Sequence, residues 1–391
     1  MNPNDYTKPS GKLIEDKKAI GTFYPFIPEK LPPKIEYDDE LVSLLSEADS
    51  KFNKLNGAGL NLPNPFILML PYIKKEAVVS SKIEGTQASL TDLFLYELTD
   101  KEPKDERLGL KEVSNYVTAM EKSLALIKRG KWKRQPVNLD LLKSAHIILM
   151  QGVRGQEENP GIFRTTQNAI VPYKNCAPEK VLFFPPPPNS LNGLLQDLEL
   201  FILYPPNNIP LLIQIALIHY QFECIHPFED GNGRIGRLLI MLYLCKQAKI
   251  EYPLLYLSAY FESREEEYKL KLREVSQKSE WKEWIVFFLK GISLQSDEAL
   301  KSVEKLIKLR ADYNDLLRKQ KTNKNVRQLV EVLFKNPYID ANTASEYLKV
   351  SHQTGISCIR KLESLGILKI YLERKRNILY KAVDILSILG V

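Results

Sequence analysis

The predicted fold depends on one stretch, His226-Pro227-Phe228-Glu229-Asp230-Gly231-Asn232-Gly233-Arg234-Ile235-Gly236-Arg237. Upstream, the apolar run from Ile213 to Phe222 predicts a helix that Pro227 must end soon afterwards. Downstream, apolar residues recur at helical spacing, which predicts a second helix beginning near Gly233: Ile235, Leu238, Leu239 and Leu242. A short loop with two glycines therefore joins two helices.

The residue types in this loop suit phosphate. Gly231 and Gly233 permit main-chain conformations in which successive N–H groups form an anion-binding nest, at the positive end of a helix. Arg234 and Arg237 are three residues apart and share one helical face. Asp230 can hold a divalent cation and His226 can act as a base, so the stretch predicts a nucleotide site rather than a plain turn.

The stretch resembles, at every specified position, the Fic family signature His-Pro-Phe-x-Asp-Gly-Asn-Gly-Arg-x-x-Arg. Fic proteins are mostly helical enzymes that transfer AMP from ATP to a hydroxyl on a target protein. The resemblance implies a mainly α fold: a Fic-type helical bundle with a small β-hairpin flap. A winged helix-turn-helix is expected at the C-terminus.

The resemblance also implies a role for each residue. His226 would take the proton from the incoming Ser, Thr or Tyr hydroxyl, and Asp230 would bind Mg²⁺. Arg234 would hold the β-phosphate of ATP and Arg237 the γ-phosphate, while Phe228 would anchor the loop in the core. The expected ATP-binding residues are Gly231, Asn232, Gly233, Arg234, Ile235, Gly236, Arg237 and Tyr268.

A second motif lies upstream, in Ser80-Ser81-Lys82-Ile83-Glu84-Gly85. The simpler interpretation is a helix that ends at Gly85, with Glu84 in solvent. The motif also resembles the Ser/Thr-x-x-x-Glu-Gly/Asn inhibitory motif of many Fic proteins, which makes Ser80 and Glu84 regulatory residues. In that family the glutamate pairs with the second arginine of the signature, here Arg237, and ATP then binds unproductively. A carboxylate facing a phosphate-binding arginine competes directly with phosphate.

Two further segments match the family. In the stretch from Asn159 to Val171 apolar and polar residues alternate, and Pro and Gly bound the stretch. This pattern predicts a hairpin, with Val181 to Phe184 as its second arm. It resembles the family's flap, residues 161–172, which would pair with a target segment by strand addition. Tyr268 would line the adenine pocket or pack in the core, and Val275 stands where some relatives have Asn, which leaves contacts with the base open. His146 is expected to pack without a catalytic role.

The C-terminal region, residues 320–391, follows a charged helix and a basic hinge and is expected to be a winged helix-turn-helix. His352, Gln353, Thr354 and Arg360 could meet bases, and Arg374, Lys375 and Arg376 could meet phosphates, so DNA binding is possible. Packing, dimerisation or target docking is favoured slightly over DNA binding, because the recognition helix is only modestly basic. A homodimer is a further possibility.

Composition places the chain among ordinary soluble proteins. It has 391 residues, 44% hydrophobic and 26% charged, and a net charge of +7 that does not by itself imply nucleic acid. Its four widely spaced cysteines suggest neither disulfides nor zinc, and no apolar run is long enough to span a bilayer. A cytoplasmic location is therefore expected. Residues 1–35 are expected to form an extended arm, with Tyr24 to Pro28 as a possible surface strap.

Three segments are expected: an N-terminal arm with the inhibitory helix (1–105), the Fic catalytic core (106–295), and a linker helix with the winged helix (296–391). The leading hypothesis is a protein adenylyltransferase that uses ATP and Mg²⁺, modifies targets and itself, and is autoinhibited by Glu84. One alternative is that Glu84 orients water for removal of AMP from a modified protein. The other is a DNA-binding regulator whose Fic core senses nucleotide.

Overall fold

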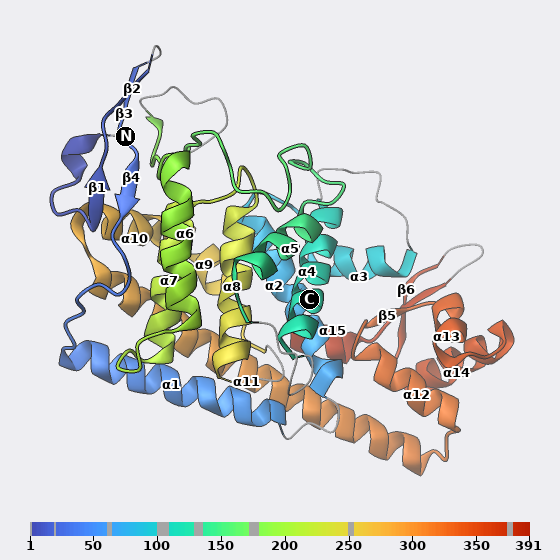
Figure 1. The fold of residues 1–391 in the computed structure, drawn as a ribbon. Helices are drawn as coiled ribbons and strands as arrows, with labels where there is room; N and C mark the ends of the chain where they lie inside the picture. The colour runs from blue at the N-terminus through green and yellow to red at the C-terminus, as the bar shows by residue number, and fades with distance from the viewer. Residues whose placement is uncertain are drawn as a thin grey trace. The chain divides into compact units, whose positions relative to one another are not determined.

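The structure, a computed structural model, describes residues 2–18, 21–60, 65–99, 109–128, 136–171, 180–248, 254–373 and 378–391. It is mainly helical with small antiparallel sheets (Figure 1), which confirms the predicted fold class. The chain divides into two compact units built from separate stretches. The first contains residues 1–52, 115–251 and 257–295, and the second contains residues 53–114, 252–256 and 296–391. The three-segment division stays a prediction.

Two helices form the centre of the first unit, α7 (Leu211–Ile225) and α8 (Asn232–Gln247). They pack against each other on either side of the glycine loop, and almost every residue in both is buried. α7 is apolar on almost every side, as expected of a helix in a core, whereas α8 also buries Arg234 and Arg237. The predicted helix–loop–helix is therefore present, with the second helix beginning one residue before Gly233.

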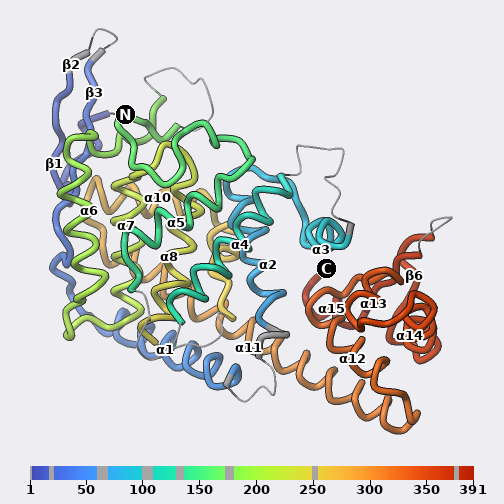
Figure 2. The backbone as a smooth tube through the Cα atoms, turned by 45° about the vertical axis from the view of Figure 1, so that its right-hand side comes forward, coloured from blue at the N-terminus to red at the C-terminus, as the bar shows by residue number. Residues whose placement is uncertain are grey.

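Other helices of the first unit surround this pair. α6 (Pro188–Leu203) and α10 (Glu265–Lys278) pack against α7, and α5 (Leu139–Leu149) packs against α8. α6 has Pro at its first position, where a missing N–H costs nothing. α4 (Leu110–Lys128) comes before α5 in the chain, and α9 (Ser258–Ser263) precedes α10. Figure 2 shows α6 beside α7, and α5 beside α8.

The N-terminal arm is more ordered than predicted. After a 3₁₀ turn η1 (Pro3–Asp5), β1 (Gly11–Leu13) pairs with β4 (Phe26–Pro28), and β2 (Asp16–Lys18) pairs with β3 (Gly21–Phe23), both antiparallel. Phe26 is fully buried and donates its N–H to the Phe184 carbonyl over 2.9 Å, and the Ser10 N–H bonds to Ser276 of α10. Burial of Phe26 makes the arm a strap on the first unit, the alternative that the sequence left open.

The second unit contains α2 (Pro65–Ile83), α3 (Leu90–Thr99) and the C-terminal elements. The latter are α12 (Lys324–Leu333), β5 (Tyr338–Ile339), α13 (Ala341–Leu348), α14 (His352–Ser364), β6 (Lys369–Leu372), β7 (Leu379–Lys381) and α15 (Val383–Leu389). The three strands form one sheet in the order β5-β7-β6. The winged-helix assignment and any DNA contact stay predictions. Arg374, Lys375 and Arg376 lie outside the described residues.

Three longer helices complete the chain. α1 is Asp39–Leu60. α2 begins at Pro65 and contains Pro71 in its interior; burial of the Tyr72 and Ile73 side chains that follow offsets the lost main-chain bond. α11 (Trp281–Lys319) is one continuous helix, and no proline interrupts it. In the part of the chain that the structure describes, no helix has the length and apolarity needed to cross a bilayer.

Candidate active site

His226 ends α7 in a left-handed conformation, with φ 50° and ψ 62°. Few residues other than glycine adopt this conformation, and the cost is accepted mostly at functional sites. The helix ends just before Pro227, as the sequence predicted. The His226 Nδ1 lies 3.3 Å from the Glu223 carbonyl. A carbonyl only accepts, so Nδ1 carries the hydrogen and the basic lone pair is on Nε2.

Arg164 holds the main chain around His226. Its Nε donates to the His226 carbonyl over 2.8 Å, and its Nη2 donates to the Ile225 and Pro186 carbonyls over 3.3 and 2.6 Å. Its own N–H donates to the Pro227 carbonyl over 2.9 Å. Burial lowers the pKa of Arg164 to about 10, partly offset by the charge of Glu229. Sequence reasoning missed this residue, because its only signal was a place in the alternating stretch 159–171.

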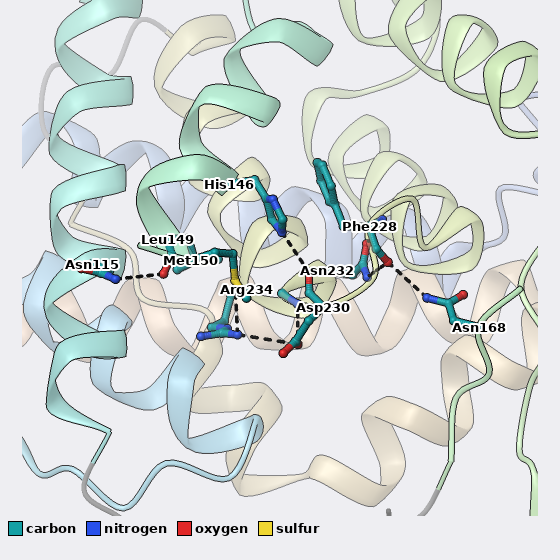
Figure 3. Close-up of polar contacts among 10 residues, drawn as sticks. Asn115, His146, Leu149, Met150, Asn168, Phe228, Asp230, Asn232 and Arg234 are labelled. Atoms are coloured by element: carbon teal, nitrogen blue, oxygen red, sulfur yellow. Dashed lines mark hydrogen bonds and ion pairs between the residues drawn. The ribbon is translucent and has the colours of Figure 1, made fainter. Parts of the chain in front are cut away.

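The residues after Arg164 attach the flap segment to the loop. Thr166 donates from its hydroxyl to Glu229 over 2.7 Å, and Asn168 donates from its amide to the Phe228 carbonyl over 3.1 Å (Figure 3). Alternate residues therefore face the loop, as in a strand. Among the described residues, the predicted hairpin shows one antiparallel bridge, between Ile170 and Phe183, while Thr166 and Asn168 bond to the loop. Residue 172 lies outside the described residues, and target docking on the flap stays a prediction.

Gly231 begins α8 in a left-handed conformation, with φ 78°. A Cβ there would lie 3.0 Å from the Met150 sulfur, so both the conformation and the space demand glycine. Gly233 was expected to need the same freedom, but it lies in the first turn of α8 and its φ is not positive. The first N–H groups of a helix have no intrahelical acceptor, and α8 presents them at this loop.

The side chains of the loop hold one another. Asn232 is buried and bonds to both main-chain groups of Phe228: its Oδ1 accepts from the N–H over 2.8 Å, and its Nδ2 donates to the carbonyl over 2.7 Å (Figure 3). Asp230 accepts from the Gly231 N–H over 2.6 Å. Phe228 is fully buried, as predicted for an anchor. The Asn232 side chain thus shapes the loop, and its main-chain N–H is the first of α8.

The two arginines of the stretch are both buried, Arg234 with 1% and Arg237 with 2% of its surface exposed. The Arg234 Nη2 lies 3.8 Å from the Asp230 carboxylate and 3.9 Å from the Met150 sulfur (Figure 3). Two guanidiniums in one buried helical turn create a positive potential that suits a polyphosphate. Ile235 and Gly236 are buried; a Cβ on Gly236 would lie 2.2 Å from the Glu223 carboxylate, so this glycine is required for packing.

Tyr268 is buried in an aromatic cluster, with 3% of its surface exposed. Its hydroxyl donates to His219 Nε2 over 2.8 Å, and its ring stacks on Phe261 with centroids 4.4 Å apart. His219 Nδ1 donates to the Gly236 carbonyl over 3.2 Å. This environment favours the packing role for Tyr268, and contact with adenine stays a prediction.

Ser80 and Glu84 belong to the second unit. Ser80 is fully buried within α2, and Glu84 follows the last residue of that helix. Gly85 has φ 95°, its N–H bonds to Lys82, and the Thr86 N–H bonds to Ser81, which is a left-handed helix end. The simpler interpretation of this motif, a helix cap at Gly85, is therefore correct for the main chain. The regulatory role concerns the Glu84 side chain and stays a prediction.

Asp230 is the only member of the expected site that suits a metal ion. Among the described residues, no group of three or more His, Cys, Asp or Glu side chains gathers as a metal site. The Asp230 side chain is 36% exposed and lies beside the amides of the loop. Mg²⁺ is commonly held by one or two carboxylates together with water and substrate phosphates, so a single carboxylate here fits Mg²⁺ brought in with a nucleotide.

Comparison with known proteins agrees with this geometry. Residues 136–244 match the model of the Fic/DOC family, and residues 42–125 match that of the Fic/DOC family N-terminal region. The chain is 28% identical over 167 residues to a probable protein adenylyltransferase of Aquifex aeolicus, covering 43% of this chain and 46% of that one. It is 28% identical over 225 residues to the protein adenylyltransferase Fic of Nematostella vectensis, covering 55% and 47%. The chain thus spans about half the length of these curated relatives.

Solved structures show the same fold. A Fic family protein from Desulfovibrio desulfuricans G20 superposes with a TM-score of 0.56 at 18% identity, covering 90% of this chain and 98% of that one. Fic-1 of C. elegans, residues 134–508, superposes with a TM-score of 0.51 at 17% identity, covering 66% and 71%.

Proposed function

The chain belongs to the Fic/DOC family, and on that premise we propose that it is a protein adenylyltransferase that moves AMP from ATP to Ser, Thr or Tyr hydroxyls of target proteins and of itself. The observation that carries the proposal is the His226 imidazole of the signature stretch, whose Nδ1 donates to the Glu223 carbonyl, which leaves the basic lone pair on Nε2. Attack on phosphorus needs a positioned base and charge stabilisation more than covalent chemistry.

The reaction follows from these positions. The hydroxyl oxygen of the target bonds to the α-phosphorus of ATP while His226 Nε2 takes the hydroxyl proton. The bond from the α-phosphorus to the bridging oxygen breaks, and pyrophosphate leaves. The main-chain N–H groups that begin α8, with Arg234 and Arg237, hold the β- and γ-phosphates. Bound Mg²⁺, held by Asp230, would neutralise charge on the phosphates.

We also propose that Glu84 inhibits this reaction by pairing with Arg237 and displacing the γ-phosphate. The support is the match of Ser80 to Gly85 to the inhibitory motif and the charge logic. A carboxylate and a phosphate compete for one guanidinium. Substitution of Glu84 by Gln removes the charge at nearly constant volume. Self-labelling should rise at least tenfold in Glu84→Gln, whereas Glu346→Gln, a change of an exposed glutamate in the second unit, should leave it unchanged.

The experiment that tests the transfer uses two positions of label. With Mg²⁺ and ATP labelled at the α-phosphate, Glu84→Gln should become labelled; with ATP labelled at the γ-phosphate, it should not. His226→Ala in the same background should abolish labelling. His352→Ala, a change of an exposed histidine of α14, is the matched control and should leave labelling intact. Label from the γ-phosphate would indicate phosphoryl transfer and reject the proposal.

A further inference from the structure

One imidazole outside the signature stretch touches both the glycine loop and the flap. His146 projects from α5 and has 1% of its surface exposed. Its Nε2 lies 2.9 Å from the Asp230 carbonyl, directly before Gly231, and its Nδ1 lies 2.9 Å from the Gly161 N–H at the start of the flap (Figure 3 shows the first of these contacts). The two loops that would bind nucleotide and target therefore meet at the two nitrogens of one ring.

The partners fix the protonation state of this ring. The Gly161 N–H can only donate, so Nδ1 must be the acceptor and carries no hydrogen. The Asp230 carbonyl can only accept, so Nε2 must carry the hydrogen. His146 is therefore neutral with its hydrogen on Nε2, opposite to the tautomer of His226.

Packing fixes the orientation of the ring. His146 stacks on Phe228 of the signature stretch with ring centroids 3.9 Å apart and an angle of 7° between the planes. Phe163 of the flap segment packs on the same Phe228, with centroids 5.3 Å apart, and the Lys143 ammonium of α5 lies 4.5 Å from the centre of the Phe163 ring. The stack restricts rotation of the imidazole, so both nitrogens keep their partners.

Glycines let both loops come this close to α5. Gly231 has φ 78°, and a Cβ there would lie 3.3 Å from His146 Nε2. Gly161 has φ 81°, and a Cβ there would lie 2.6 Å from the Ile147 side chain. Each loop therefore carries a left-handed glycine at or next to the group that bonds to His146. The contacts need this geometry, which only glycine adopts without strain.

We propose that His146 is a positioning residue that sets the phosphate loop through Nε2 and the target-docking flap through Nδ1, and so aligns the two substrates of the reaction with each other. The inference rests on the proposed function for what the two loops bind. It does not give His146 a chemical step, because the ring is buried and both nitrogens are occupied. If the proposal is correct, the contact with Asp230 and the contact with Gly161 can be removed separately.

Three substitutions separate them. In His146→Asn the side-chain amide reaches the position of Nδ1, so it keeps the Gly161 contact and loses the Asp230 contact. In His146→Gln the amide reaches the position of Nε2, so it keeps Asp230 and loses Gly161. Phe at this position keeps the stack on Phe228 and loses both contacts. Ser144→Ala, an exposed change on the same helix, is the control.

The readouts are hydrogen–deuterium exchange of the full chain in the segments 159–171 and 229–235, and the Kd for ATP with Mg²⁺. We expect exchange about tenfold faster in the flap segment alone for His146→Gln, in the loop segment alone for His146→Asn, and in both for His146→Phe, as loss of a buried hydrogen bond implies. The Kd should rise about tenfold in the Asn and Phe variants only. Equal changes in both segments for Asn and Gln, or no change in either, would overturn the proposal.

A measurement on the unaltered protein guards against variants that do not fold. The chain has four histidines, so nitrogen-15 NMR of the imidazoles can assign each tautomer. The proposal requires hydrogen on Nε2 of His146, and hydrogen on Nδ1 would reject it. If the exchange pattern holds but no form binds ATP, the coupling stands and the proposed function fails.

Discussion

The Arg164 guanidinium donates to the carbonyl of His226 over 2.8 Å, so a buried cation from the flap segment fixes the one non-glycine residue of the signature stretch that has a positive φ. The same side chain binds the carbonyls on both sides of the flap, at Thr166 and Pro186. The position of the candidate base therefore depends on a residue more than sixty positions away in the sequence.

Loss of the Arg164 hydrogen bonds should lower the activity strongly while the protein still folds. In Arg164→Met, the buried carbonyls of Ile225 and His226 lose their donor, and each unpaired group costs about 1–3 kcal/mol. We expect self-labelling in the Glu84→Gln background to fall at least tenfold and the Tm to fall by several degrees. Arg154→Met, a change of an exposed arginine in the same region, is the matched control. Unchanged labelling in Arg164→Met would show that the Arg164 side chain does not position His226.

Substitution of Gly231 should weaken ATP binding far more than substitution of a glycine that has the same conformation elsewhere in the chain. Gly231 and Gly366 have φ 78° and 77°, but a Cβ on Gly366 meets nothing within 4 Å, while one on Gly231 meets Met150 and His146. Substitution by Ala strains the main chain by about 1 kcal/mol at either site. Isothermal titration with Mg²⁺ and ATP should show at least tenfold weaker binding for Gly231→Ala and unchanged binding for Gly366→Ala. Equal affinities for the two variants would contradict the loop's role in binding phosphate.

Tyr268→Phe distinguishes packing from contact with adenine. The Tyr268 hydroxyl donates to the buried His219 Nε2, and its loss leaves that nitrogen unpaired at a cost of about 1–3 kcal/mol. We expect a lower Tm and an ATP Kd within twofold of the unaltered protein. A Kd that rises tenfold while the Tm stays constant would place Tyr268 against the nucleotide.

Stability should depend on pH through His219. Burial, and then the positive charge of Arg237, lower its pKa from 6.5 to about 3. The unfolded chain therefore binds a proton between these values that the folded chain excludes, and stability falls as pH falls from 6.5 toward 3, by about 1.4 kcal/mol per pH unit from this group. Tm measured from pH 7.5 to 4.5 should fall more steeply for the unaltered protein than for His219→Leu. Parallel curves would contradict a neutral buried His219.

The sequence predicted the helix–loop–helix around His226 because apolar periodicity and two glycines are local signals. It also predicted the end of α2 at Gly85 and the burial of Phe228.

It could not predict the left-handed His226, because that conformation is imposed by Arg164 and by the packing of α7 on α8, which are long-range contacts. His146 was expected only to pack. Its two hydrogen bonds depend on where the flap and the glycine loop contact α5, and the periodicity of the sequence does not predict such long-range contacts. Alternation in residues 164–168 serves hydrogen bonds to the loop, while Ile170 pairs with Phe183 of the second predicted arm.

The central claim is that the His226 imidazole takes a proton so that AMP can pass to a protein hydroxyl. Intact-protein mass spectrometry after incubation with Mg²⁺ and ATP tests it most directly, with Glu84→Gln compared with the double variant Glu84→Gln/His226→Ala. The account predicts an added AMP on the single variant and none on the double variant. An equal amount of added AMP on both would contradict it.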